Sequence, residues 1–165
     1  MGWNVAGILL HDASVDDVVK GLPGGPVDTG GRLSGDEALS MGADADHAVG
    51  VVGEWTMITD PGMQVMFDQD AWESLSSASR RALAFLVHSV SSTYGFSYHV
   101  DGRPARELLH VEGECVRDEG DPLPEESDLP EPGTEDHVLG LIGHLTGDQW
   151  WSAVLDAPFR ILRAG

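Results

Sequence analysis

The Asp101-Gly102 pair and the segments that flank it constrain the fold more than any other part of this sequence. Residues 94–100 (YGFSYHV) alternate between aromatic or apolar side chains and smaller or polar ones, which is typical of a strand with two different faces. Asp-Gly between two strands favours a tight hairpin turn, because both turn positions need a positive φ. The returning strand is expected at 106–112, and residues 82–90 (ALAFLVHSV), apolar on both faces, are expected to precede the hairpin as a central strand. We therefore predict an antiparallel three-strand meander over about 82–112.

Shorter predicted elements surround this meander, without the regular strand–helix alternation of a parallel sheet. They are a buried strand at 3–10, a helix capped by Ser14, a hairpin at 47–59, a short strand at 63–67, helices at 70–79, 135–145 (capped by Thr134) and 148–155, and a C-terminal segment at 159–162 that packs back. Pro104, next to the turn, predicts a bulge in the hairpin register. At 165 residues we predict a single α+β domain, built on a mainly antiparallel sheet with short packing helices.

The stretch 21–35 is rich in glycine and contains two prolines, so we expect an irregular surface loop there. Glycine-rich loops can cradle phosphates, but neither the GxGxxG pattern nor GxxxxGKS or GxxxxGKT occurs in this stretch. The stretch also follows a predicted helix instead of opening one. The sequence therefore predicts no cofactor.

Net charge narrows the class of partner. Lysine and arginine total 9 against 28 aspartates and glutamates, which gives a net charge of −19. Such a chain lacks the basic footprint needed to bind a nucleic-acid backbone or an anionic membrane surface, and it has no apolar run of about 18 residues that would span a bilayer. The charge is compatible with a basic protein partner, with cations, or with an acid-rich proteome. Cys115 is the only cysteine, so no internal disulfide can form, and we expect a cytoplasmic protein.

The acidic, proline-rich segment 118–136 concentrates this charge, with nine acidic residues, four prolines and no lysine or arginine. Its prolines favour an extended path. One of the adjacent Trp150 and Trp151 is expected in the core and the other at the surface, where tryptophan often anchors protein contacts. The candidate contacts to a partner are Glu125, Glu126, Asp128, Glu131, Glu135, Asp136 and Trp151.

Three stretches carry a family resemblance: HSV at 88–90, FSYHVDGRPARELL at 96–109 and EGECVRDEGDPLPEE at 112–126. In this order they are similar to an uncharacterised family of small acidic proteins from high-GC bacteria, a domain of unknown function with the pattern HSV…DGR…G-x-PLP-x-E. The resemblance implies one compact α+β domain in which 118–126 belongs to the fold. Residues 127–136 have no counterpart in that family and are expected to link into the next helix. The resemblance gives no indication of an activity, because none is established for that family.

Two constellations could carry chemistry. His110, Glu112 and Glu114 lie at i, i+2 and i+4, so a continuous strand would place them on one face, as in a divalent-metal site; an exposed polar strand face has the same pattern, and this is only a weak alternative to no metal site. His88 and Ser89 are adjacent on a predicted strand and point to opposite faces, and no GxSxG elbow accompanies them. We therefore predict no catalytic residues, and expect His88 to be buried and hydrogen-bonded.

Arginines of the predicted meander leave two interpretations open. They can pair with the acids of 118–136 and tie that segment to the sheet, or they can line a pocket for an anionic ligand. The five arginines concerned are Arg80, Arg81, Arg103, Arg106 and Arg117. The ligand-binding hypothesis uses His88, His99, Arg103 and Arg106.

Three functional hypotheses follow. The first is a non-catalytic binding protein that presents a negative surface to a basic protein partner, as an inhibitor, an immunity-type protein or a nucleic-acid mimic would. The second is an enzyme or small-ligand-binding domain, which requires a deep pocket that gathers histidines and arginines of the meander with carboxylates. The third is a structural subunit of a larger assembly.

Overall fold

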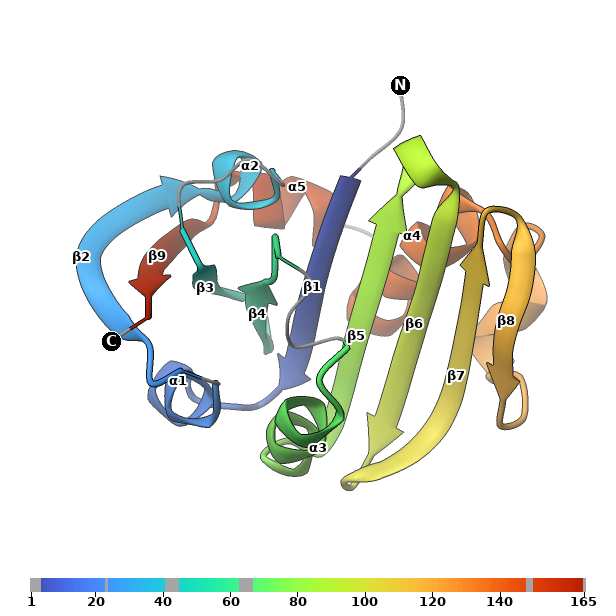
Figure 1. Cartoon of the computed structure of the whole chain (residues 1–165), viewed down its shortest axis with the longest axis horizontal. Coiled ribbons are helices and arrows are strands. Elements are labelled where there is room, and N and C mark those ends of the chain that lie inside the picture. Colours follow the sequence, from blue (N-terminus) through green and yellow to red (C-terminus); the bar gives the residue numbers. More distant parts are fainter. Residues whose placement is uncertain (1–3, 23, 41–44, 63–66, 148–149, 165) are drawn as a thin grey trace.

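The computed structural model describes residues 4–22, 24–40, 45–62, 67–147 and 150–164, which form one antiparallel sheet covered by helices (Figure 1). The order of the nine strands is β2-β9-β3-β4-β1-β5-β6-β7-β8. The strands are β1 (Asn4–His11), β2 (Val27–Ser34), β3 (His47–Val52), β4 (Trp55–Thr59), β5 (Arg81–His88), β6 (Thr93–Val100), β7 (Arg103–Val111), β8 (Glu114–Glu119) and β9 (Pro158–Arg163). The helices are α1 (Val15–Gly21), α2 (Gly35–Ala38), α3 (Gln69–Ser77), α4 (Glu135–Thr146) and α5 (Trp150–Asp156), with 3-10 turns η1 (Ser89–Ser91) and η2 (Pro124–Asp128). The predicted α+β class agrees with this architecture.

The central strands β1 and β5 are buried on both faces, which explains their continuous apolar sequences. Leu9 and Phe85 pack on the side of α2, α4 and α5. Ile8 and Ala84 pack on the opposite side, against α1 and α3 (Figure 1). Each fully buried leucine, isoleucine or phenylalanine side chain contributes about 1.5–3 kcal/mol, so this double-sided core stabilises the sheet that carries every site described below.

Strands β5 to β8 pair in chain order, each antiparallel to the next. Asp101 and Gly102 have φ values of 52° and 76°, as a tight Asp-Gly turn requires. The register shifts between Tyr98 and His99, opposite Pro104, where a bulge was predicted. This run is longer than the predicted three-strand meander, because a second tight turn at Glu112 and Gly113 returns the chain as β8.

The prediction of an irregular loop across 21–35 is wrong for its second half. Residues 27–34 form β2, which pairs with β9 at one edge of the sheet. The register shifts between Asp28 and Arg32, and Gly30 in this interval has a φ of 81°, so the glycine accommodates a bulge. The predicted C-terminal segment does pack back, as β9, between β2 and β3.

The helix starts follow local capping chemistry. Ser14 Oγ accepts a hydrogen bond from the Asp17 amide at 3.2 Å, and Thr134 Oγ1 accepts one from the His137 amide at 3.2 Å. The helix predicted at 70–79 begins one residue earlier, at Gln69, and is capped by Asp68. The short strand predicted at 63–67 falls mostly on residues 63–66, which lie outside the described residues. Among the described helices, none has the length and apolar character needed to cross a bilayer.

Candidate functional site

The predicted partner-binding residues occupy different environments in the fold. Asp128, Glu131 and Asp136 are exposed. Glu125 and Glu135 are half-buried, and Glu135 accepts a hydrogen bond from Ser89 Oγ at 3.1 Å. Trp150 is buried in the core, whereas the side chain of Trp151 lies outside the described residues, so its predicted role stays a prediction.

The prediction that Glu126 contacts a partner is corrected by the structure, because the carboxylate of this residue is bound inside the protein. Its side chain is 7% exposed, and it accepts hydrogen bonds from Arg106 Nε at 3.1 Å and Arg106 Nη2 at 3.3 Å. Arg106, on β7, also donates to Asp118 and to the backbone carbonyls of Glu119 and Gly120. A bidentate arginine–carboxylate pair of this kind fixes geometry as well as charge. Arg106 therefore ties the acidic segment to the sheet, which is one of the two interpretations left open for the arginines.

The residues of the ligand-binding hypothesis do not gather in one site. His88 and His99 lie at opposite ends of the β5–β6 pair, because His88 faces Thr93 and His99 faces Ala82, six residues or roughly 20 Å along β5. Arg106 faces Tyr98, the neighbour of His99, so it lies on the other face of the sheet. Arg103 is exposed beside the turn. His88 itself is half-buried and contacts Ser91 Oγ at 2.8 Å, so it is hydrogen-bonded but not fully buried as expected.

The weak metal alternative is also wrong in its geometry. Glu112 lies in the turn between β7 and β8, so the chain reverses between His110 and Glu114 and the three side chains share no strand face. The ring of His110 instead lies against Gly133, where an added Cβ would sit 2.6 Å from its Cδ2 atom. Within the described ranges, no group of three or more histidine, cysteine, aspartate or glutamate side chains is placed to hold a metal ion.

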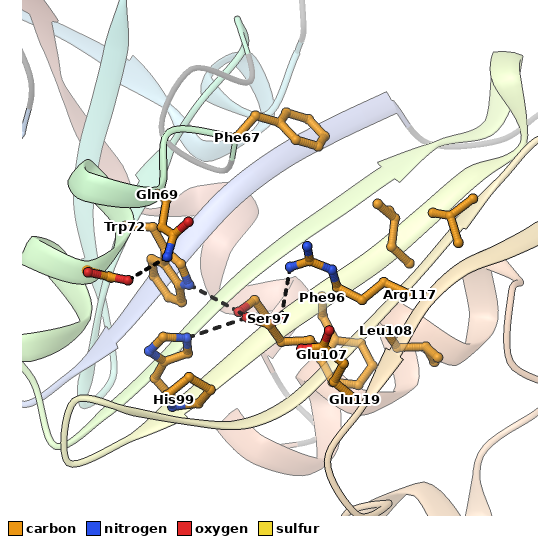
Figure 2. Close-up of a pocket in the computed structure, with 14 residues that line it drawn as sticks. Phe67, Gln69, Trp72, Phe96, Ser97, His99, Glu107, Leu108, Arg117 and Glu119 are labelled. Atoms are coloured by element: carbon orange, nitrogen blue, oxygen red, sulfur yellow. Dashed lines mark hydrogen bonds and ion pairs between the residues drawn. The ribbon is translucent and has the colours of Figure 1, made fainter.

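A cleft of about 570 Å³ lies between α3 and strands β6, β7 and β8 (Figure 2). Its size is in the range of small-molecule sites. Its lining combines aromatic and apolar side chains with charged ones. The lining includes Phe67, Trp72, Glu73, Ser97, His99, Glu107, Val116, Arg117 and Glu119.

A hydrogen-bonded chain crosses the floor of this cleft (Figure 2). Trp72 Nε1 donates to Ser97 Oγ at 3.1 Å, and Ser97 Oγ donates to Glu107 Oε1 at 3.0 Å. Arg117 Nη1 donates to Glu107 Oε2 at 2.9 Å. Both oxygens of Glu107 are therefore engaged, and the Ser97 hydroxyl proton points to a carboxylate. The hydrogen-bond partner of the Ser97 hydroxyl is therefore a carboxylate and not an imidazole.

His99 lies beside this hydrogen-bonded chain, and none of the described residues forms a hydrogen bond with its ring. It is 3% exposed, and neither ring nitrogen has a hydrogen-bond partner among the described residues. Its Nε2 atom lies 3.8 Å from Glu107 Oε1, which is an electrostatic contact, and its ring meets Trp72 edge-on at 4.9 Å. Burial lowers the pKa of His99 below its usual value and outweighs the opposing effect of Glu107. The imidazole is therefore neutral at neutral pH, and one of its two nitrogens can accept a hydrogen bond.

The sequence contained part of this site. The alternation along β6 already placed Ser97 and His99 on one face, opposite Phe96 and Tyr98. Nothing local indicated that Trp72, 25 residues earlier, would cover that face, because α3 meets the sheet only through tertiary packing. Charge pairing of Arg117 with Glu107 likewise depends on the register of β8 against β7.

Comparisons with known proteins leave the chain without an assigned relative: no family model, curated protein or solved structure matches it. The resemblance to the uncharacterised high-GC family therefore stays a prediction.

Two buried histidines predict a loss of stability in mild acid. Burial lowers the pKa of His99, and burial also lowers that of His137, where Glu126 opposes it and Arg106 and His110 reinforce it. The unfolded chain takes up these protons near its ordinary pKa of about 6.5 while the folded chain does not, so the free energy of unfolding falls as pH drops below about 6.5.

Urea unfolding at about pH 7.5 and about pH 5.5 checks this expectation. The variants His99→Gln and His137→Gln are each expected to lose part of the wild-type difference between the two pH values. His144→Gln, which removes an exposed histidine of α4, is the control and is expected to keep that difference. An unchanged difference in both buried-site variants would contradict the prediction.

Proposed function

We propose that this protein is a non-catalytic binding protein that meets a basic protein partner through its acidic edge, defined as residues 112–136. The observation that carries the proposal is a concentration of exposed carboxylates on β8 and on the segment after it. Strand β8 is the last strand of the sheet (Figure 1). Eight acidic residues of this edge are exposed: Glu112, Glu114, Asp118, Glu119, Asp121, Asp128, Glu131 and Asp136. Arg117 is the only lysine or arginine between them.

The anchoring of the acidic edge supports this role. The Arg106–Glu126 pair attaches the segment to β7, so the remaining carboxylates are displayed on a fixed frame instead of a flexible tail. Preorganised charge of one sign accelerates association with a partner of opposite sign and disfavours other partners. Inhibitors, immunity-type proteins and nucleic-acid mimics share this arrangement in principle, and a cytoplasmic location is part of the proposal.

The outer edge of β8 gives the partner a second means of contact. All six residues of β8 are exposed, and β8 is the last strand in the sheet order. Terminal strands offer backbone groups to an extended segment of another chain, and their charged side chains disfavour pairing between copies of the same protein. A basic extended segment meets both conditions.

Neutralising part of the acidic edge is expected to weaken partner binding about tenfold at low salt, because each exposed ion pair contributes about 0.2–1 kcal/mol. The test variant is Asp128→Asn/Glu131→Gln/Asp136→Asn. Proteins captured from a lysate of the source organism at low salt and released at high salt are identified and purified, and their dissociation constants are measured for wild type and variant.

The matched control is Asp17→Asn/Asp36→Asn/Asp70→Asn, which changes the net charge equally at exposed acids in the first turns of α1, α2 and α3. The proposal requires the control to bind like wild type. If no basic protein is captured at low salt, or if the two triple variants bind equally well, the acidic edge is not the partner site and its charge serves solvation alone.

A second candidate function is favoured by one specific observation. The cleft between α3 and the sheet holds a buried histidine, His99, whose ring nitrogens have no hydrogen-bond partner among the described residues, next to Glu107 and Arg117. Buried polar groups are normally satisfied, and an unsatisfied one in a cleft of this size is a site at which a small ligand can complete the hydrogen bonding. We propose ligand binding at this cleft as the alternative to, or companion of, the acidic edge.

A further inference from the structure

The charges in the cleft select among ligand classes. Three carboxylates line it, those of Glu73, Glu107 and Glu119, against one cation, Arg117. Glu107 already accepts hydrogen bonds from Arg117 and Ser97, so it holds the only arginine of the described lining in place. An anionic ligand would meet two further carboxylates without a free cation to pair with, which opposes its binding.

The apolar part of the cleft restricts the class of ligand further. Phe67 and Val116, on opposite sides, are 62% and 57% exposed, although large apolar side chains are usually covered. The Trp72 ring lies between Phe67 and His99 (Figure 2) and meets the His99 ring edge-on. Phenylalanine and tryptophan faces bind hydrocarbon and also attract cations. A ligand that covers Phe67 and Val116 therefore needs an apolar or aromatic stem.

His99 adds a requirement for a hydrogen-bond donor. A neutral imidazole has one nitrogen that can only accept, and here that nitrogen is buried with no donor among the described residues. A purely hydrocarbon ligand would leave it unsatisfied, and a carboxylate would offer it no proton. An ammonium group would donate to it while its charge is balanced by the carboxylates of Glu73 and Glu119.

We propose that the cleft binds a cationic amine carried on an apolar or aromatic stem. The inference rests on the second proposed function, ligand binding at the cleft, and names the class of ligand. Two sources supply this chemistry: a free arylalkylamine, or a lysine side chain presented by the basic protein partner. In both cases the stem covers Phe67 and Trp72, and the ammonium group reaches the carboxylates and His99.

The test is a titration of the full ¹⁵N-labelled chain, followed by NMR, with three probes of similar shape: 2-phenylethylamine, 2-phenylethanol and 3-phenylpropanoate. The readout is the Trp72 indole N–H signal, assigned by its loss in Trp72→Phe. We expect the amine to move this signal with a dissociation constant about tenfold lower than that of the alcohol, because hydrogen bonds to charged groups are roughly twice as strong as neutral ones. The carboxylate is expected to leave the signal unchanged.

A charge-matched pair of variants locates the binding. Glu73→Gln/Glu119→Gln is expected to bring amine binding down to the level of the alcohol and to leave alcohol binding unchanged. Asp17→Asn/Asp36→Asn, with the same charge change at exposed acids in the first turns of α1 and α2, is expected to bind the amine like wild type. Equal loss in both variants would show non-specific attraction and would overturn the inference.

The remaining outcomes separate the inference from the function on which it rests. If the alcohol or the carboxylate binds at least as well as the amine, the cleft is a ligand site but the amine class is wrong. If none of the probes moves the Trp72 signal, both are wrong. Tighter binding of N-acetyl-lysine amide than of 2-phenylethylamine, with N-acetyl-norleucine amide as its neutral control, would support the lysine side chain as the source, and the reverse order would support a free amine.

Discussion

Replacing Arg106 with methionine is expected to lower the free energy of unfolding by about 3–5 kcal/mol, since removing one partner of a buried ion pair leaves the other charge uncompensated. Arg106 and Glu126 have side chains only 5% and 7% exposed, so water cannot replace the lost guanidinium. The same change leaves the carbonyls of Glu119 and Gly120 without their donor. Loss of the guanidinium destabilises the Asp118 carboxylate less, because its side chain is 57% exposed. Urea denaturation at neutral pH measures the difference.

Two further variants assign this loss to the buried charge. Arg103→Met removes an exposed arginine from the same strand and is expected to change stability by less than about 0.5 kcal/mol. Arg106→Met/Glu126→Gln removes both charges and is expected to recover about 1–2 kcal/mol of the loss, as coupled partners do not add. If Arg106→Met unfolds within about 1 kcal/mol of wild type, the acidic segment is not held by this pair.

The partners of Arg106 could not be predicted from the sequence. Both interpretations of the arginines, pairing with the acidic segment and binding of an anionic ligand, were chemically sound. Choosing between them required knowing that Arg106 and Glu126 face each other. Arg106 sits on β7 and Glu126 in η2, after another strand and a turn. Glu126 lies in the same acidic stretch as Asp128, and the packing of η2 against α4 separates the buried acid from the exposed one.

Features set by neighbouring residues were predictable. Asp-Gly turns, the serine and threonine caps at Ser14 and Thr134, and the doubly buried β5 follow from backbone preferences and from burial periodicity within a few residues. Pairings between distant segments were not. Strand β2 pairs with β9 from the far end of the chain, and its glycines, which accommodate the bulge, lower its own strand propensity.

In the candidate cleft, too, one residue could be predicted from the sequence and its tertiary contacts could not. His99 was singled out from the sequence, but its predicted companions His88 and Arg106 lie at the far end of β5 and on the opposite sheet face. Its actual neighbours, Trp72 and Glu107, come from a helix packed across the sheet and from a register shifted by the Pro104 bulge. A one-residue shift exchanges the faces of a strand, so the composition of such a site follows from the bulge and not from the motif.

Substituting Gly35 with alanine is expected to destabilise the fold by about 3 kcal/mol or more, at the upper end of what overpacking produces. Gly35 is the first residue of α2, which lies against α5. An added Cβ would lie 1.6 Å from the carbonyl oxygen of Val154 and 2.6 Å from its carbonyl carbon. These are backbone atoms of α5, so no side-chain rotation can relieve the overlap and the two helices must move apart.

Helix propensity alone predicts the opposite sign, which makes a matched control available. Gly143 lies inside α4, and a Cβ added there meets no atom of the described residues within 4 Å outside its own helix backbone. Gly143→Ala is therefore expected to stabilise the protein by about 0.5–1 kcal/mol. The same substitution should thus shift the urea midpoint in opposite directions at the two positions.

The α2–α5 contact decides between these signs. Displacing α5 from α2 would also disturb Val154 and Trp150, which are buried in the same core as Ala38 of α2. The loss should therefore exceed that of a surface clash and should appear as a lower midpoint with an unchanged denaturant slope, as for a native-state effect. A Gly35→Ala protein as stable as wild type would mean that α2 and α5 are not in backbone contact, and that the helical layer over this half of the sheet packs differently.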